Sequence, residues 1–528
     1  MKLSILLLAC VALVSSYKMV FFTLGMSKSQ ILLNARVAEA LMNAGHDATL
    51  VLLEIMEGVD NSQLKLPKGL KVVPVNCSLG LHMKAAEKEQ ELIFKDTSFF
   101  DSEQRASLSK KLEFMLKSCD KLINNDELLS WLENEKFDVA FPHMYDLCTV
   151  GLIHKAKIPS WIWLNSGKIM DYVAKIVGAP IIPSYVSPMM MEAHDTLNFK
   201  ERVKSFFGHA LMDIIWPKTV ANPETELFRK KFGSDFPDLI EVAKNCSLVF
   251  VNSHDVYGLA SPTLGKIINI GGIGMDDKAA SELPEEFKKI VDKGKGTVIM
   301  SFGSVAPAHK MPKEWKHGLL EAFKALPDYQ FVVRYMENDL DEILPSNVHF
   351  YKWLPQSDLM HHPKVKALIT HGGYNSMQEA VAAGKPLAVI PLFGDQPKNS
   401  QIAKKHGIAV VLQKSEITKD VVVEKLTTLL TDPSYSTKAA LMKQLTKDYP
   451  YNPSEQIVQW TEYVAKFKTL EFLEPAGIRL GWIQYHSLDV LLFVSSILLL
   501  TLFIIFKVLR GIYNLIRCNK RVSKSKSE

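Results

Sequence analysis

The amino-acid sequence predicts an α/β protein with two doubly wound domains, each built on a parallel sheet, and a single C-terminal transmembrane helix. Apolar, β-forming runs alternate with helical segments in both halves of the chain, a pattern typical of parallel sheets covered on both faces. The chain has 528 residues, enough for two sizeable cores. An uncharged run at residues 490–506 would span about 25 Å as a helix, close to the thickness of a bilayer core.

The first half begins with a βαβ pattern. A β-rich run is followed by an amphipathic segment that ends before Gly45, and glycine is the usual residue just past a helix end. The predicted elements are, in order, a strand at 17–25, a helix at 31–43, a strand at 48–54, helical residues across 84–135, and strands at 137–142 and 158–164.

Residues 167–243 lack a clear pattern and are expected to be irregular. Within them, residues 177–191 read VGAPIIPSYVSPMMM and are rich in Pro, Met and apolar residues. In a soluble domain such a stretch forms either a core loop or the lining of an apolar pocket, and the sequence leaves both readings open.

The second half shows the same alternation more regularly. The predicted strands lie at 297–304, 329–335, 367–369, 387–392 and 409–413, and the predicted helices at 314–326, 375–383 and 399–406. We therefore expect an N-terminal domain at 17–265, a linker at 266–295 and a C-terminal domain at 296–475. In open α/β sheets, ligands bind beyond the carboxyl ends of the strands, and these two edges can face each other.

Both ends of the chain indicate insertion into a membrane system. Residues 1–16 carry Lys2, an apolar run and two small residues, the layout of a secretory signal peptide. The transmembrane helix is predicted at 490–509, and the tail at 510–528 is strongly basic. Basic tails stay in the cytosol, so we expect a single-pass type I membrane protein with its domains in the lumen.

The last five residues, KSKSE, resemble the dilysine signal that returns membrane proteins to the endoplasmic reticulum. They place Lys524 and Lys526 near the carboxyl end. A short span also suits the thin membrane of that organelle. The predicted location is the endoplasmic reticulum membrane.

The remaining composition excludes few functions. A net charge of +5 is too small to indicate nucleic acid binding, and no metal-ligand spacing is present. Asn76 and Asn245 each begin an Asn-Cys-Ser sequon, so both are predicted glycosylation sites. Four cysteines would lie in the oxidising lumen, where spacing alone does not fix their pairing: Cys77, Cys119, Cys148 and Cys246.

The stretch ITHGGYNSMQEA, residues 369–380, has the features of a phosphate site. An apolar strand ends, Gly372 and Gly373 allow a tight turn, and a helix starts near Asn375. The first backbone N–H groups of a helix lack intrahelical partners, and the helix dipole adds partial positive charge there. Asn375, Ser376 and His371 add side-chain donors, so the helix start can hold an anion.

The surrounding residues 353–396, WLPQSDLMHHPKVKALITHGGYNSMQEAVAAGKPLAVIPLFGDQ, resemble the donor-binding signature of the UDP-glycosyltransferase family. The signal peptide, two domains, membrane anchor and basic tail also resemble its membrane-anchored animal members. Details such as NARVAEALMNAGHDATLVLLE, residues 34–54, look most like invertebrate members. The resemblance implies the GT-B fold, which consists of two facing Rossmann-like domains.

The resemblance also implies how the nucleoside and the sugar are held. Trp353 would stack on the uracil, and Gln356 would hydrogen-bond the uracil or its ribose. Glu379 would accept hydrogen bonds from the ribose hydroxyls. Asp395 and Gln396 would contact the hydroxyls of the sugar.

By the same resemblance, His371, Asn375 and Ser376 would hold the diphosphate after the turn at Gly373. Ser304 would donate to it from the end of a neighbouring strand. The helix start and these donors would neutralise the leaving diphosphate, so no metal and no cofactor are expected. The co-substrate would be UDP-glucose or UDP-glucuronate.

The sequence departs from the family at the catalytic dyad. Counting back from His46, the position of the family's catalytic His is Gln30. Glutamine has no basic site at any useful pH, so it cannot accept a proton. The family's partner carboxylate follows the strand at 137–139, and the aligned residue here is His143, with Asp146 three positions further on.

Three explanations of this departure stay open. His143, oriented by Asp146, could act as the base; the acceptor could be an amine or a similar nucleophile that attacks unaided; or the chain could bind UDP-sugar without transferring it and modulate active relatives by association. The residue aligned with the clamp for the glucuronate carboxylate is Asn252, which favours glucose as the sugar. The acceptor is expected to be small and lipophilic, and the sequence does not identify it.

Overall fold

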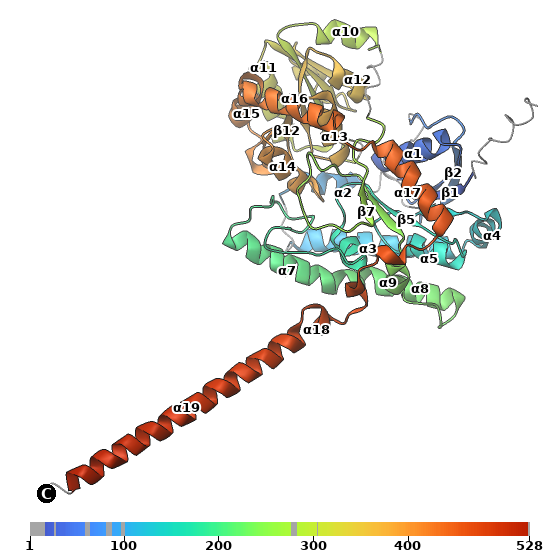
Figure 1. Ribbon diagram of the computed structural model, residues 1–528. Helices are drawn as coiled ribbons and strands as arrows, with labels where there is room; N and C mark the ends of the chain where they lie inside the picture. Colours follow the sequence, from blue (N-terminus) through green and yellow to red (C-terminus); the bar gives the residue numbers. More distant parts are fainter. Residues whose placement is uncertain are drawn as a thin grey trace, which may run out of the picture. The chain divides into compact units, whose positions relative to one another are not determined.

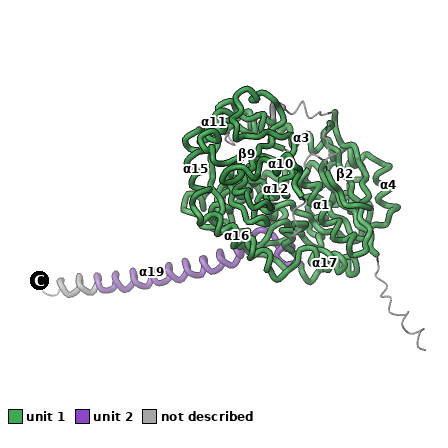
Figure 2. Tube along the Cα trace, turned by 90° about the horizontal axis from the view of Figure 1, so that it is seen from above, with its two compact units in different colours: residues 1–473 green, residues 474–528 purple. Residues whose placement is uncertain are grey.

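The computed structural model describes residues 16–25, 28–58, 64–80, 87–96, 101–275, 282–303 and 305–525. Residues 1–473 form one compact unit, and residues 474–528 form a second (Figure 2). The predicted signal peptide at 1–16 lies almost entirely outside the described residues and stays a prediction.

Among the described residues, the first half of the chain carries seven parallel strands in two adjoining sheets, with orders β3-β2-β1-β4 and β5-β6-β7 (Figure 1). A bridge between Ala140 and Trp161 joins them. The strands are β1 (Lys18–Leu24), β2 (Asp47–Glu54), β3 (Lys71–Asn76), β4 (Val139–Phe141), β5 (Ile162–Asn165), β6 (Leu248–Val251) and β7 (Ile267–Asn269). The β1–β2 pairing confirms the predicted βαβ unit.

Helices pack around these sheets, and four of the helices overlap residues 167–243, the segment that was expected to be irregular. The helices are α1 (Lys28–Asn43), α2 (Glu87–Leu92), α3 (Ser102–Ile123), α4 (Asp126–Glu135), α5 (Cys148–Lys155), α6 (Asp171–Ile176), α7 (Phe199–Trp216), α8 (Asn222–Phe232) and α9 (Leu239–Lys244), with a π-helical turn at Pro217–Ala221. The irregular reading of 167–243 was therefore wrong for α6 to α9 and the π-helical turn, whereas residues 177–198 contain no helix or strand, as expected. Asn198 and Glu201 form a capping box that starts α7, and this local signal was present in the sequence.

The second half forms one six-stranded parallel sheet of order β10-β9-β8-β11-β12-β13. Its strands are β8 (Gly296–Ser301), β9 (Tyr329–Arg334), β10 (Val348–Tyr351), β11 (Val365–Thr370), β12 (Leu387–Val389) and β13 (Ala409–Val411). Its helices are α10 (Glu285–Val291), α11 (Lys313–Lys324), α12 (Gln356–His361), α13 (Tyr374–Ala383), α14 (Gln396–Lys405), α15 (Lys419–Thr431), α16 (Pro433–Lys447) and α17 (Pro453–Phe467). The doubly wound pattern predicted for this half is confirmed.

The central strand β8 shows why both faces of this sheet are covered. Val298 and Met300 point into one apolar cluster with α11 and α15, while Ile299 points into a second cluster with α10, α12, α13 and α16. Such two-sided burial is typical of parallel sheets. The chain then returns to the first half, where Ile457 and Val464 of α17 pack in the same cluster as α1.

The second unit contains α18 (Trp482–Tyr485) and the long helix α19 (Leu488–Ser525). Within Leu488–Arg517 of α19, a window of 18 residues has a mean hydropathy of 2.7, and the segment is long enough to cross a membrane. The C-terminal apolar helix predicted from the sequence is present.

Candidate functional site

The candidate site lies where the carboxyl ends of both sets of strands meet. From the first half come the start of α1 and the residues after β4, β5 and β6, and from the second half comes the turn between β11 and α13. The contacts are direct: Asn375 Nδ2 donates to the Ser29 carbonyl at 3.3 Å, and the hydroxyls of Ser253 and Tyr374 are 2.9 Å apart. Ligands of open α/β sheets bind at such edges.

The start of α13 is open to a ligand. Gly373 is its N-cap and supplies no side chain to the first-turn N–H groups, and no acidic residue lies in that turn. A Cβ on Gly373 would lie 2.9 Å from the His371 ring, so only glycine fits there. Burial lowers the pKa of His371 to about 4, and the ring is therefore neutral at physiological pH.

Asn375 is tied to the first half by a buried polar network. Its Oδ1 accepts from Asn252 Nδ2 at 3.0 Å, and Gln378 Nε2 donates to Asn252 Oδ1 at 3.0 Å. Gln378 Oε1 accepts from the Tyr257 hydroxyl at 2.9 Å and from the Gly272 N–H at 2.8 Å. Asn252 therefore links the first half of the chain to α13 in the second half. On the sequence alone, Asn252 was considered only as the residue aligned with the clamp for the glucuronate carboxylate.

Trp353, three residues before the start of α12, presents a large flat ring. Its side chain is 46% exposed, and two cations approach the ring: Lys28 Nζ lies 5.4 Å and Arg334 Cζ 5.5 Å from its centroid. Arg334 also donates to the carbonyl of Gly303. A planar aromatic group of a ligand can stack on this exposed indole, and the two neighbouring cations attract negative charge on the same ligand.

Two predicted nucleoside contacts, Gln356 and Glu379, lie together with Ser376, a predicted diphosphate contact. Gln356 Nε2 donates to Glu379 Oε2 at 2.7 Å and lies 3.5 Å from Ser376 Oγ. Burial raises the pKa of Glu379, while the positive charge of Arg36 and the Gln356 hydrogen bond oppose the rise. Gln356 orients the carboxylate of Glu379, which keeps further acceptor positions.

The residues predicted to meet the sugar start α14. Asp395 is its N-cap residue, and Asp395 Oδ2 accepts from Asn399 Nδ2 at 2.8 Å. Burial raises the pKa of Asp395, and the Asn399 bond opposes the rise. Gln396 is buried, and its Oε1 accepts from the N–H groups of Leu392 and Phe393, so its oxygen stabilises the turn.

At the position of the missing base, Gln30 Nε2 donates to the Tyr145 hydroxyl. That hydroxyl lies 3.0 Å from Ser166 Oγ. Burial raises the pKa of Tyr145 to about 12, with the Ser166 bond opposing the rise and the charge of Asp395 adding to it. Sequence reasoning missed Tyr145 and Ser166, although each follows a predicted strand, which is where functional residues of such sheets lie.

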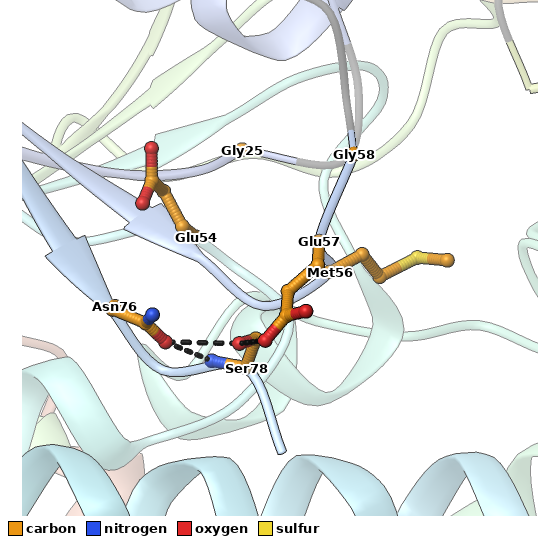
Figure 3. Close-up of a pocket in the computed structure, with 7 residues that line it drawn as sticks. All are labelled: Gly25, Glu54, Met56, Glu57, Gly58, Asn76 and Ser78. Carbon is orange, nitrogen blue, oxygen red and sulfur yellow. Dashed lines mark hydrogen bonds between the residues drawn. The ribbon is translucent and has the colours of Figure 1, made fainter. Parts of the chain in front are cut away.

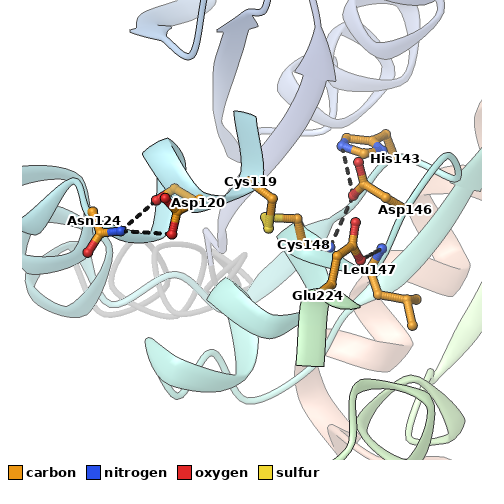
Figure 4. Close-up of a disulfide and its surroundings, with 8 residues drawn as sticks. All are labelled: Cys119, Asp120, Asn124, His143, Asp146, Leu147, Cys148 and Glu224. Atoms are coloured by element: carbon orange, nitrogen blue, oxygen red, sulfur yellow. Dashed lines mark hydrogen bonds and ion pairs between the residues drawn. A yellow bond between two sulfur atoms is a disulfide. The ribbon is translucent and has the colours of Figure 1, made fainter. Parts of the chain in front are cut away.

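His143 and Asp146 are buried and lie close together near the Cys119–Cys148 disulfide (Figure 4). His143 Nδ1 accepts from the Tyr145 N–H at 3.3 Å, and His143 Nε2 lies 3.7 Å from Asp146 Oδ1. Burial lowers the pKa of His143, and the charge of Asp146 opposes this. The neighbouring Glu224 is buried and accepts from the Leu147 N–H, and burial together with the charge of Asp146 raises its pKa.

The pairing that the sequence left open is Cys119 with Cys148, and this disulfide joins α3 to the start of α5 beside Asp146. Cys77 and Cys246 are buried free thiols. Among the described residues, no group of three or more His, Cys, Asp or Glu could hold a metal ion. Ser304, the remaining predicted diphosphate contact, lies outside the described residues.

A separate cavity of about 200 Å³ lies at the ends of β1, β2 and β3 (Figure 3). It is lined by Gly25, Glu54, Met56, Glu57, Gly58, Asn76 and Ser78. Asn76 is exposed, and its Oδ1 accepts from the N–H and hydroxyl of Ser78 at 3.0 and 2.9 Å. Asn245 is also exposed. Glycosylation at both residues stays a prediction.

Comparisons with known proteins relate the chain to one family and one fold. A family model described as UDP-glucoronosyl and UDP-glucosyl transferase matches residues 20–524. UDP-glucosyltransferase 2 of Dactylopius coccus is 31% identical over 470 residues, covering 87% of each chain. UDP-glucuronosyltransferase 1A7 of Mus musculus is 28% identical, covering 89% of this chain and 87% of its own. The crystal structure of the glycotransferase of kitacinnamycin matches with a TM-score of 0.57 at 16% identity, covering 85% of this chain and 99% of that one, and it shows the GT-B fold.

Proposed function

Because the chain belongs to the UDP-glucoronosyl and UDP-glucosyl transferase family, whose enzymes transfer sugar from a UDP-sugar, we propose that it transfers a hexose to a small lipophilic acceptor. The observation that carries this proposal is the open start of α13, flanked by Trp353 and by the Gln356–Glu379 pair. These groups supply an anion site, a stacking surface and a carboxylate for the ribose, and these are the three parts of a UDP site.

The donor would lie with its diphosphate on the first-turn N–H groups of α13 and its sugar at Asp395. The acceptor nucleophile attacks the anomeric carbon from the side opposite to UDP. The bond from that carbon to the diphosphate oxygen breaks, and UDP leaves with the electron pair. A single displacement inverts the anomeric carbon. The helix start stabilises the charge that develops on UDP, so the proposed reaction needs no metal and no cofactor.

None of the side chains at the position of the family's dyad is an evident base for the proton of the acceptor. Gln30 cannot accept it, and Tyr145, with a pKa of about 12, stays protonated at neutral pH and can only donate. Both ring nitrogens of His143 face protein groups. This arrangement favours an acceptor that attacks unaided, such as an amine or a readily ionised phenol, over one that relies on His143 and Asp146.

The proposed sugar is glucose. Asn252, the residue aligned with the glucuronate clamp, is buried and uncharged, and its amide contacts Asn375 and Gln378. Asn252 Nδ2 already donates to Asn375 Oδ1 and to the Ser166 carbonyl, so a sugar carboxylate placed near it would lack the hydrogen bond that a basic residue supplies, which is worth about 1.5–3 kcal/mol.

The proposed location is the endoplasmic reticulum, with the compact unit in the lumen and α19 as a single-pass anchor. The apolar stretch Leu488–Arg517 supports the anchor, and the Cys119–Cys148 disulfide suits an oxidising compartment. The basic tail supports a cytosolic C-terminus.

The replaced dyad also favours a second candidate function. The chain could bind UDP-sugar without transferring it and modulate active relatives by association. Gln30 is occupied by its bond to Tyr145, and this supports a donor site that has lost its chemistry.

The test is UDP release by the purified full chain, with UDP-glucose and UDP-glucuronate against phenols and amines. We expect turnover with UDP-glucose and an amine or an acidic phenol. The Gln30→His variant should extend turnover to less acidic hydroxyls, and Gln444→His, an exposed change on α16, serves as control. A native protein that binds UDP but turns over no acceptor, while Gln30→His gains activity, would refute transfer and establish the binding function. Loss of the native pH dependence in His143→Gln would identify His143 as the base.

A further inference from the structure

Residues 87–96 of the first half pack into the core of the second half. They contain α2 and the turn after it, and they lie in the chain between β3 and α3. Phe94 is 2% exposed, and among the described residues it is the only buried side chain of the first half in the cluster that covers one face of β8. The centroid of its ring lies 5.9 Å from that of Trp315, in an edge-on contact, and 6.2 Å from that of Phe302. A side chain of the first half therefore completes the core of the second.

A lysine of the second half fixes this segment in place. Lys414 Nζ donates to the carbonyls of Ile93 and Lys95 at 2.7 and 2.8 Å. Burial lowers the pKa of Lys414 to about 8, and the charge of Asp96 opposes the fall. The amine therefore keeps its proton at neutral pH. Because the two carbonyls belong to the residues on either side of Phe94, the second half sets the position of the Phe94 ring.

Phe302 connects Phe94 to the turn that precedes the predicted diphosphate contact Ser304. It directly follows β8, is buried in the same cluster as Phe94, and its ring centroid lies 6.5 Å from that of His371, in an edge-on contact. The next residue, Gly303, has a φ of +69°, and a Cβ there would lie 3.2 Å from His371 Cε1. A displacement of Phe302 would therefore move the backbone against which the His371 ring rests.

The orientation of the His371 ring decides whether it can bind an anion. A Cβ on Gly303 or Gly373 would lie 3.5 or 2.9 Å from His371 Nε2, so this edge of the ring lies beside both glycines. The Thr370 hydroxyl lies 3.4 Å from Nδ1, which leaves Nε2 for a ligand. A neutral imidazole has only one N–H donor, and a hydrogen bond weakens steeply when the donor is misdirected.

We propose that Phe94 is a positioning residue of the donor site: it fixes the turn at Phe302 and Gly303 behind the His371 ring, so that the ring can donate to the diphosphate of the sugar nucleotide. The proposal rests on the proposed function, because it requires a UDP-sugar seated on α13. It gives residues 87–96 of the first half a share in binding the donor.

The test compares UDP with uridine, because only UDP carries the diphosphate. Displacement of a fluorescent UDP analogue from the purified full chain gives both affinities, and the readout is the ratio of the UDP affinity to the uridine affinity. Phe94→Leu should lower this ratio about tenfold, the size of one hydrogen bond to a charged group. The matched control is Phe323→Leu, because Phe323 is buried in the same cluster but stacks on Phe331. Both variants should lower the melting temperature, and the control should keep the native ratio.

Two further variants connect the effect to the contacts described above. In a His371→Ala chain, which already lacks the ring, Phe94→Leu should lower the ratio no further. Lys414→Met releases residues 87–96 without a change in the core and should also lower the ratio, whereas Lys419→Met, at an exposed position on α15, should not. If Phe94→Leu does not fold, Lys414→Met decides the question alone.

Three results would overturn the proposal. A native ratio in Phe94→Leu, or in Lys414→Met where Phe94→Leu does not fold, would show that Phe94 stabilises the core and nothing more. An equal fall in the ratio with and without the His371 ring would show that Phe94 does not act through this residue. Both results would leave the donor site standing. A native chain that binds UDP no more tightly than uridine would refute the donor site on α13 and, with it, the basis of the proposal.

Discussion

Replacing Glu379 with alanine should weaken UDP binding about 150-fold. In the structure Glu379 Oε2 accepts from Gln356 at 2.7 Å, and the carboxylate keeps further acceptor positions, which we propose bind the ribose hydroxyls. Two hydrogen bonds from ribose hydroxyls to a charged group contribute about 1.5 kcal/mol each at the lower end of the usual range. Their sum, about 3 kcal/mol, corresponds to about 150-fold in affinity.

Isothermal titration of the purified full chain with UDP measures this change, with Glu321→Ala, an exposed position on α11, as the matched control. Titration with 2′-deoxy-UDP isolates the ribose. The native chain should bind it more weakly than UDP, whereas Glu379→Ala should bind both alike. A variant within threefold of the native affinity, or one that still prefers UDP over the deoxy analogue, would refute the ribose assignment.

Three further outcomes are expected. Replacing Cys119 and Cys148 by serine removes a disulfide with a sequence separation of 29 and should lower the free energy of unfolding by about 3–4 kcal/mol. The melting temperature should fall accordingly, and an unchanged melting temperature would contradict this expectation. UDP should raise the low pKa of His371, because the negative charge of UDP favours the protonated ring. Binding of UDP at about pH 5 should therefore take up protons in the native protein but not in His371→Asn. Calorimetry in two buffers measures the proton uptake, and equal uptake by both proteins would exclude the contact. Deleting Lys524–Glu528 should let the protein leave the endoplasmic reticulum, and unaltered localisation by microscopy would show that the tail signal is not needed.

Much of the fold could be predicted because local patterns and global packing agree along most strands. All residues of β8 are buried, and residues 367–369 of β11 form a short apolar run that is also buried, as expected for central strands of a parallel sheet. β3 was missed because Pro74 argues against a strand, and the structure places β3 at the edge of its sheet, where proline is tolerated. α7 was missed because the sequence analysis found no regular pattern in residues 167–243, and the apolar side of this helix faces outward instead of into the core.

The sequence predicted only those residues of the candidate site that lie within one contiguous motif. The Gln356–Glu379 pair follows from the signature, because both residues lie within 353–396. The Gln30–Tyr145 bond joins residues 115 positions apart, and no periodicity encodes such a contact. The network of Asn252 and Gln378 depends in the same way on how the two halves meet.

The position of the donor is the claim on which every other step depends. The most direct measurement is photolabelling of the full chain with an azido-uracil analogue of UDP-glucose, followed by mapping of the labelled peptide. The account predicts that the label attaches within residues 353–361, beside Trp353, and that UDP prevents it. Label elsewhere in the chain, or label in that peptide that UDP does not reduce, would contradict a donor seated on α13.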